Sequence, residues 1–169
     1  MFIGIVKYTM NIKNLKPTKN GKTKQGYFDI SESTKYNGKV KTVIYRSSWE
    51  HMFCPWCERN PLVEKWCSES VQIKYHCPID NTVKNYYPDF WIKLTDGRTM
   101  VVEVKPAQEY KIEPSKPKRK TQKSLARYKY LKNAVTVNLS KFKSAISYCK
   151  SRGWTFFVAD ETWFGLNKK

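Results

Sequence analysis

The sequence predicts an α/β fold in which a mixed sheet with a central β-hairpin is flanked by helices. Residues 86–106 contain two apolar runs on either side of an Asp-Gly turn, a strong signal of a β-hairpin. Residues 49–56 carry apolar side chains at helical spacing. Near the C-terminus a helical pattern precedes an apolar strand, residues 154–159, which is the order expected when a parallel strand is added through a crossover helix.

The length and the net charge of the chain limit the folds and the partners that are possible. The 169 residues are enough for one domain with a real core, and 40% hydrophobic residues predict a folded chain. The formal net charge of +18 indicates an anionic partner. No apolar run approaches the roughly 20 residues of a spanning helix, and the run at residues 2–6 is too short for a signal peptide. We therefore expect a cytosolic protein, neither secreted nor membrane-bound, whose partner is nucleic acid.

The first 42 residues are polar, lysine-rich and without sustained periodicity. We expect a basic N-terminal arm at residues 1–42, partly ordered by packing against the rest of the protein. A solvated tail and a dedicated DNA-binding arm are the two interpretations. A single domain is expected over residues 43–169.

The first helix is predicted to begin at Ser47 or Ser48, because Ser47-x-x-Glu50 fits a capping box. Pro55 is expected to bend or end this helix. Asn60-Pro61 is expected to begin a short second helix, with proline at its favoured first position.

Five cysteines in a cytosolic protein should be reduced thiols. Cys54 and Cys57 have one zinc-type spacing, but no second Cys-x-x-Cys or His-x₃-His accompanies them. Both fall within the apolar pattern of the first helix, where they would be buried. We therefore expect no structural Zn²⁺.

The alternation of Val71, Ile73 and Tyr75 with polar residues predicts the first strand of the core sheet. Glu69 precedes it, and an exposed glutamate at the strand entry is one interpretation.

The register of the hairpin decides which side chains share a face. A two-residue turn at Asp96-Gly97 would place Asp89 opposite Val104. A three-residue loop at residues 95–97, with Gly97 as the left-handed residue of a bulge, pairs Leu94 with Arg98 and Asp89 with Glu103. We predict the three-residue loop, because it separates two faces completely. One face then carries Asp89, Trp91, Val101, Glu103 and Lys105, and the other carries Phe90, Ile92, Leu94, Met100, Val102 and Val104.

Two facing carboxylates repel one another unless a cation lies between them, and an oxygen-rich pair suits Mg²⁺. Lys105 could hold or deprotonate a water molecule, or neutralise a phosphate oxygen. Metal-assisted phosphodiester cleavage needs these parts. The alternative is a solvated hairpin face with an ordinary Glu103–Lys105 pair.

Residues 111–132 form a basic segment that directly follows the candidate site. Prolines make its first half a loop, and Leu125, Tyr128 and Leu131 indicate a helix after it. A charge run is often only a solvated face, but the position of this one favours contact with the phosphate backbone of DNA. Gln108 precedes it, either in contact with substrate or metal-bound water or as a polar loop residue. The expected backbone contacts are Lys111, Lys116, Lys118, Arg119, Lys120, Lys123 and Arg127.

A final helix is predicted to start near Asn138 or Ser140 and to end at Gly153. The strand after it is apolar on both faces, so it should be buried. Asp160 and Glu161 are interpreted as acids at the strand end, outside the site.

Pro88-Asp89 and, after the hairpin, Glu103-Val104-Lys105 resemble the signature of the PD-(D/E)xK nuclease superfamily. The wider context is similar to the tailed-phage head-completion nucleases and, more distantly, to the endonuclease subunit that cuts transposon ends. The resemblance covers about residues 45–108 well, continues weakly to the C-terminus and does not extend to residues 1–40. The context consists of Ser47-Ser48-Trp49-Glu50, Asn60-Pro61-x-Val63, Trp66-Cys67-Ser68-Glu69, Ile73-x-Tyr75, Tyr87-Pro88-Asp89-Phe90 and Val102-Glu103-Val104-Lys105-Pro106.

This resemblance implies a restriction-endonuclease-like core and Mg²⁺-dependent DNA cleavage, with Mn²⁺ expected to substitute. It implies that Asp89, Glu103 and the Val104 carbonyl hold the metal. It also implies that Glu50 adds a carboxylate from the first helix, although a purely capping role stays open, and that Glu69 lies near the site.

The biological role implied by the resemblance is processing of packaged DNA before the neck and tail join. The protein would then act in the host cytoplasm and the virion, with phage portal or neck proteins as candidate partners. One alternative is a transposon-end or recombination-type nuclease. The other is a non-catalytic DNA-binding structural protein of the virion.

Overall fold

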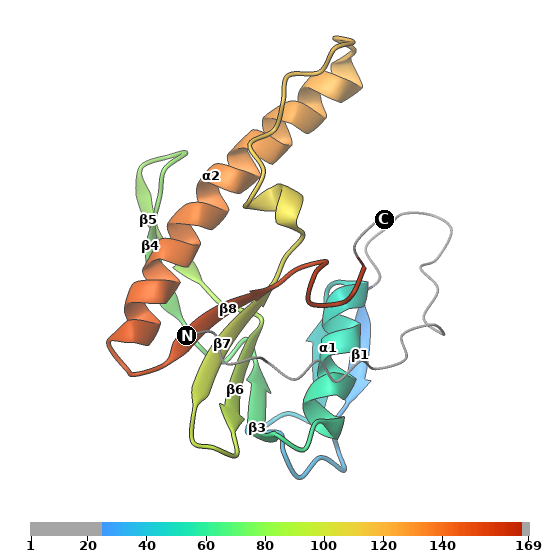
Figure 1. Ribbon diagram of the computed structural model, residues 1–169, viewed down its shortest axis with the longest axis vertical. Coiled ribbons are helices and arrows are strands. Elements are labelled where there is room, and N and C mark those ends of the chain that lie inside the picture. The colour runs from blue at the N-terminus through green and yellow to red at the C-terminus, as the bar shows by residue number, and fades with distance from the viewer. Residues whose placement is uncertain (1–24, 167–169) are drawn as a thin grey trace.

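The computed structural model describes residues 25–166, which form a mixed α/β body with one helix projecting from it (Figure 1). In chain order its elements are β1 Gly26–Asp29, β2 Thr42–Tyr45, α1 Ser48–Arg59, β3 Val63–Ser68, β4 Ile73–Cys77, β5 Thr82–Tyr86, β6 Phe90–Leu94, β7 Thr99–Val104, the 3₁₀ helix Ala107–Glu109, α2 Gln122–Lys150 and β8 Thr155–Ala159.

The main sheet has the strand order β3-β6-β7-β8. Strands β3, β6 and β7 pair antiparallel, and β8 lies parallel to β7 after the crossover through α2. The predicted mixed sheet is confirmed, as is the strand expected at residues 154–159 beside the hairpin.

The first strand of this sheet is not the predicted one. The expected short helix at Asn60-Pro61 is wrong: Asn60 caps the end of α1, the next two residues form a turn, and β3 starts at Val63. Val63 and Trp66 are buried in the core, and this tertiary packing outweighs the weak helix signal of Asn-Pro. The strand predicted around Ile73 exists as β4, but it pairs only with β5 in a separate two-stranded sheet.

The β6–β7 hairpin has the predicted register. The Leu94 N–H donates to the Arg98 carbonyl at 2.8 Å, and the Gly97 N–H donates to the Leu94 carbonyl at 3.0 Å. Gly97 has φ +86°, a left-handed conformation that costs glycine little. The three-residue loop at residues 95–97 is therefore confirmed.

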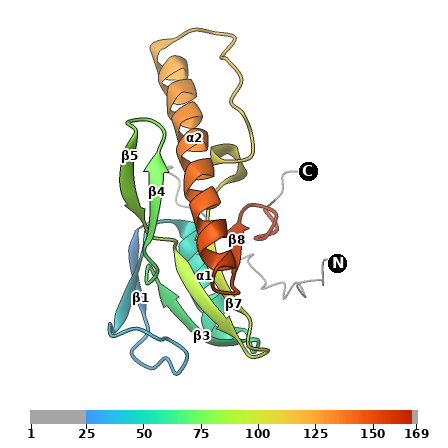
Figure 2. The same cartoon turned by 90° about the vertical axis from the view of Figure 1, so that its left-hand side faces the viewer.

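Both faces of the main sheet are covered. One face packs against α1 through a cluster that includes Phe53, Phe90, Ile92 and Val102. The other face, which carries Val101, packs against α2 and the β4–β5 hairpin. Figure 2 shows this hairpin lying alongside α2. The face that carries the candidate site is thus part of a second core, not an open surface.

Helix α1 begins as predicted and does not end at Pro55, which was one of the two outcomes expected there. Ser47 is the N-cap, and its hydroxyl accepts from the Glu50 N–H at 3.1 Å. The helix continues through Pro55 to Arg59. An interior proline costs a helix about 3 kcal/mol, and burial of Phe53 and the neighbouring cysteines offsets this cost.

The cysteines of α1 are buried free thiols, as expected for that face of the helix. Burial is the main cause that raises the pKa of Cys54 to about 12 and the pKa of Cys57 well above its usual range. Both thiols are therefore protonated at neutral pH.

Folded structure begins before residue 43, the expected start of the domain. Strands β1 and β2 pair antiparallel, with Gly26 opposite Tyr45. Ile30 and Val43 belong to the core on the α1 side. The part of the predicted arm at residues 1–24 lies outside the described residues.

Helix α2 is one continuous helix of 29 residues, where two helices were predicted. Its middle, Asn133-Ala-Val-Thr-Val-Asn138, is poor in strong helix formers and so gives a weak sequence signal. Asn138 is buried within the helix, and its side-chain amide donates to the Glu109 carbonyl at 3.0 Å. This tertiary hydrogen bond explains an asparagine that resembles a cap in sequence. Within residues 25–166, no helix is long and apolar enough to cross a membrane.

Candidate active site

The hairpin brings the two predicted carboxylates together. Phe90 lies opposite Val102, and extending this register by one residue places Asp89 opposite Glu103. The Asp89 carboxylate accepts the N–H of Val104 at 2.7 Å, so it reaches across to β7 beside Glu103. The two acids lie where β6 begins and β7 ends, and this end of the sheet is the candidate site.

Glu103 is a buried carboxylate held by two donors. The residue as a whole is only 4% exposed. Its Oε1 lies 3.2 Å from the Lys105 Nζ, and its Oε2 accepts the Tyr86 hydroxyl at 2.7 Å. A buried carboxylate is costly unless it is paired and hydrogen-bonded, and both conditions are met here.

The charges of the site act on one another. Burial raises the pKa of Asp89 well above its usual range, and the nearby charges of Glu103 and Glu50 raise it further. Burial alone would lower the pKa of Lys105, but the charges of Glu103 and Asp89 outweigh it and raise that pKa. Lys105 is therefore a cation at neutral pH. Of the alternatives predicted for Lys105, a cation favours holding a water molecule or neutralising a phosphate oxygen over deprotonating water.

Glu50 has the predicted capping geometry and also lies near Asp89. Its carboxylate accepts the Arg46 N–H at 2.7 Å and the Ser47 hydroxyl at 2.8 Å, which completes a capping arrangement at the start of α1. Its charge also contributes to the raised pKa of Asp89, so it lies within electrostatic reach of the site.

Glu69 lies beside the site at the end of β3, in a left-handed conformation with φ +45°. Its N–H donates to the Asp89 carbonyl at 3.0 Å, and its carboxylate pairs with Arg46 at 3.2 Å. The pKa of Arg46 is raised mainly by Glu69, with smaller contributions from Glu50 and Asp89. Arg46 is thus a cation at the rim of the site that no sequence motif indicated.

The 3₁₀ helix after β7 connects the site to α2. Gln108 in this turn is exposed and accepts from the Arg127 guanidinium at 3.2 Å. The preceding Ala107 N–H donates to the Glu161 carboxylate at 2.9 Å. Gln108 therefore faces the basic segment, and the turn that carries it is fixed to the chain after β8.

Asp160 has a structural role that the sequence did not indicate. It is 4% exposed and accepts from the Tyr110 hydroxyl at 2.7 Å, from the Lys111 ammonium and from the Thr162 N–H. Burial would raise the pKa of Asp160, but these donors outweigh burial and lower it to about 2. Lys111, expected to contact DNA, thus has an anionic partner within the protein.

The rest of the basic segment extends away from the sheet. In Figure 1 its loop runs beside the N-terminal half of α2, which projects beyond the sheet. Lys123 and Arg127 in this half of the helix are exposed, and so are residues 118–120 of the loop. The segment therefore presents positive charge on a protrusion that starts next to the site.

The donor atoms at the site are oxygens, which suits a hard cation. Within residues 25–166 no group of three or more His, Cys, Asp and Glu side chains is arranged to hold a metal ion. Mg²⁺ characteristically uses one or two carboxylates and keeps several waters, so a two-carboxylate site fits it and does not fit a zinc site.

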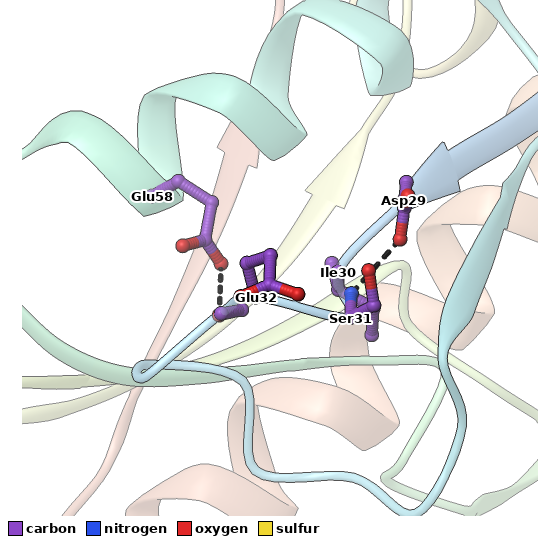
Figure 3. Close-up of a pocket in the computed structure, with 6 residues that line it drawn as sticks. Asp29, Ile30, Ser31, Glu32 and Glu58 are labelled. Carbon is purple, nitrogen blue, oxygen red and sulfur yellow. Dashed lines mark hydrogen bonds between the residues drawn. The ribbon is translucent and has the colours of Figure 1, made fainter.

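A separate hollow of about 270 Å³ lies at the other end of α1. Figure 3 shows Glu58 of α1 facing the chain that follows β1, with Asp29 bonded to Ser31. The Glu58 carboxylate accepts from Ser33 and from the indole of Trp66. Glu58 is eight residues from Glu50, about 12 Å along the helix, so this hollow is distinct from the candidate site. It is lined by Asp29, Ile30, Ser31, Glu32, Ser33 and Glu58.

The raised pKa of Asp89 predicts that Asp89→Asn stabilises the metal-free protein at neutral pH. The stabilising contribution of protonated Asp89 is present below the unfolded pKa of about 3.9 and is lost as pH rises through the raised folded pKa. An asparagine carries no such charge and still accepts the Val104 N–H. Thermal unfolding in chelator should show variant and wild type close together near pH 4 and the variant more stable near pH 8. A difference independent of pH would contradict this account.

Two comparisons with known proteins gave a match. The family model for the TnsA-like endonuclease N-terminal domain matches residues 60–161. The chain is 34% identical over 128 residues to the head completion nuclease of Enterobacteria phage T4, covering 76% of this chain and 85% of that protein. No solved structure matches significantly. The matched region begins before β3 and includes Asp89, Glu103 and Lys105.

Proposed function

Because this chain belongs to the TnsA-like endonuclease family, we propose that it is a Mg²⁺-dependent nuclease. We also propose that it processes packaged phage DNA before the neck and tail join. The chain is an endonuclease by its family and a phage head-completion nuclease by its relative. Dependence on Mg²⁺, the step in virion assembly and contact with portal or neck proteins are the proposed parts. Such a protein would act in the infected cell and in the virion.

One observation carries the catalytic proposal. The hairpin register places Asp89 opposite Glu103, and Lys105 lies 3.2 Å from Glu103. These three residue types at one end of a sheet supply the negative charge that binds a divalent ion and the positive charge that binds a phosphate.

In this proposal Asp89, Glu103 and the Val104 carbonyl hold Mg²⁺. The ion would polarise the scissile phosphate and lower the pKa of a bound water. Glu50 adds negative charge from α1, since it already acts electrostatically on Asp89. Glu69 contributes through its pair with Arg46 at the rim.

Lys105 remains protonated next to the carboxylates. We assign it to orienting the attacking water and to neutralising charge that develops on the phosphate. Its side chain is 25% exposed, so its ammonium can meet substrate while still bonded to Glu103. Gln108 follows in the turn after the site strand, where it is exposed and available to substrate.

The basic segment is proposed to bind the phosphate backbone of DNA. Prime candidates are Lys116, Lys118, Arg119, Lys120, Lys123 and Arg127, because they are exposed around the projecting half of α2. Lys111 is expected to contribute less, because its ammonium is paired with Asp160.

Removing two charges from this segment should weaken DNA binding more than catalysis. For the double variant Lys118→Ala and Arg119→Ala, we expect weaker binding of duplex DNA of any sequence. The slope of log affinity against log salt should fall by about 2, since each phosphate contact contributes about 0.9. Filter binding across a salt series measures both quantities.

A matched control keeps the same net charge change elsewhere. Lys143→Ala with Lys150→Ala removes two exposed charges from the C-terminal half of α2, near the sheet. Equal loss of salt slope in both double variants would show that net charge alone, rather than the basic segment, governs binding.

Cleavage of linear and supercoiled DNA tests the function directly. We expect cutting with Mg²⁺ or Mn²⁺ and none after chelation. A transposon-end or recombination nuclease would instead show preference for a defined sequence or branched DNA. Binding without cutting under every metal condition would leave only the structural role in the virion.

A further inference from the structure

Tyr86 is the last residue of β5 and is 3% exposed. It belongs to the second sheet, but its hydroxyl reaches the main sheet and donates to Glu103 Oε2 at 2.7 Å. The other carboxylate oxygen is close to Lys105. Each oxygen of Glu103 is thus held by a separate donor, and one of them comes from outside the hairpin motif.

The ring of Tyr86 is itself fixed by its neighbours. The Tyr75 ring of β4 meets it edge to face, with centroids 6.4 Å apart and an interplanar angle of 82°. The Lys141 ammonium of α2 lies 5.3 Å from the Tyr86 centroid and 5.7 Å from the Tyr75 centroid. Next to Lys141, the Ser140 hydroxyl donates to the His76 carbonyl at 2.6 Å and ties this turn of α2 to β4. Elements remote from the motif therefore hold the phenol in place.

This arrangement has a chemical consequence for Glu103. The Tyr86 hydroxyl donates its proton to one carboxylate oxygen, while the Lys105 ammonium lies beside the other. A hydrogen bond to one oxygen of a carboxylate fixes the orientation of that carboxylate. Carboxylates that bind metals are commonly held by such outer partners, whose loss typically lowers metal affinity or activity about 10- to 100-fold.

We propose that Tyr86 is a positioning residue that holds the Glu103 carboxylate in the orientation that binds a divalent cation. Tyr86 does not touch the reacting atoms and acts only through Glu103. The β4–β5 hairpin, which carries no residue of the nuclease motif, thereby becomes part of the metal site's support. This inference rests on the proposed function, because it assigns a further residue to the same site.

Binding of Mn²⁺ to the full chain without DNA tests the role apart from catalysis. Tyr86→Phe keeps the ring and its contacts with Tyr75 and Lys141 but removes the hydroxyl. We expect its Mn²⁺ affinity, measured by electron paramagnetic resonance of the free ion, to fall about 10-fold or more. Cleavage should fall at low Mg²⁺ and recover partly at high Mg²⁺, which a loss of folding would not produce.

Tyr75→Phe is the matched control. It removes a hydroxyl from the neighbouring ring, which also lies beneath Lys141 but makes no hydrogen bond to Glu103 within the described structure. Its Mn²⁺ affinity should stay within about twofold of wild type. Wild-type affinity in Tyr86→Phe, or equal losses in both variants, would overturn the role of Tyr86.

Mn²⁺ binding by wild type and by Asp89→Asn distinguishes a failure of this inference from a failure of the proposed function. If wild type binds Mn²⁺ and Asp89→Asn does not, the metal site stands whatever Tyr86→Phe shows. If wild type binds no Mn²⁺, the Mg²⁺ proposal is overturned together with the role of Tyr86. Thermal unfolding of Tyr86→Phe within a few degrees of wild type confirms that a lower affinity comes from the site.

Discussion

Asp89→Asn is expected to lower DNA cleavage at least about 10²-fold while leaving DNA binding near that of wild type. The substitution keeps the shape of the side chain and an oxygen that accepts the Val104 N–H. It removes the negative charge that, with Glu103, would bind the divalent ion. Loss of an electrostatic element that acts on the transition state typically costs this much in rate. Single-turnover cleavage with saturating enzyme measures the effect.

Asp96→Asn serves as the control, because Asp96 lies in the loop of the same hairpin. It is exposed and pairs with Arg98 at the loop end of the hairpin, opposite the end that carries Asp89 and Glu103. Its cleavage rate should stay within about twofold of wild type. Asp89→Asn protein that remains as active as wild type would exclude Asp89 from metal binding. The same variant should be more stable than wild type without metal near pH 8, so inactivity cannot be attributed to unfolding.

Lys105→Met is expected to lower the cleavage rate at least about 10²-fold, with a smaller effect on DNA binding. Methionine preserves much of the buried stem and removes the ammonium next to Glu103. The pKa of Lys105 is raised by Glu103 and Asp89 against the effect of burial, so the ammonium is charged when substrate arrives. If that charge orients water and stabilises the phosphate, its loss appears in the rate at saturating DNA.

Lys93→Met is the matched control on the neighbouring strand. Lys93 lies at the loop end of β6 and forms a half-exposed pair with Glu64, so its loss should leave the rate within about twofold of wild type. Lys105→Arg should recover part of the activity, because it restores a positive charge. A Lys105→Met defect found only in DNA affinity would reassign Lys105 to substrate binding.

The hairpin was predictable because the chemistry of its residues changes with period two. Only the three-residue loop gathers Asp89, Glu103 and Lys105 on one face and Phe90, Ile92 and Val102 on the other. The structure has that loop. The capping box at Ser47 and Glu50 and the parallel strand at residues 155–159 were predictable for a related reason. Each depends on local residue patterns or on chain order.

The errors arise where tertiary contacts outweigh local signals. Val63–Ser68 lacks strict alternation because Trp66 and Cys67 are both buried, so β3 was missed and its place was assigned to β4. The middle of α2 resembles a break and a new cap, but Asn138 uses its side chain to bind the turn after β7. These contacts join residues far apart in the chain and leave no periodic pattern.

The charged motif of the candidate site was predictable from the sequence. The residues that hold this motif in place were not. Tyr86, Arg46 and Asp160 act through hydrogen bonds and ion pairs with residues 17 to 50 positions away. Tyr86 lies directly before the motif, but the sequence does not show that its hydroxyl points to Glu103. That information exists only in the packing of β5 against β7.

If the basic segment contacts the DNA backbone as proposed, the length of α2 sets how far along DNA the protein extends from the site of cutting. Asn138 is anchored to the turn after β7, and Gln122 begins the helix at the far end of the projection. Sixteen residues separate them, about 24 Å at the α-helical rise. A duplex held at both ends of this span would be covered over about seven base pairs, at 3.4 Å for each step. The length of α2 would thus determine how much DNA the protein covers on one side of the cut.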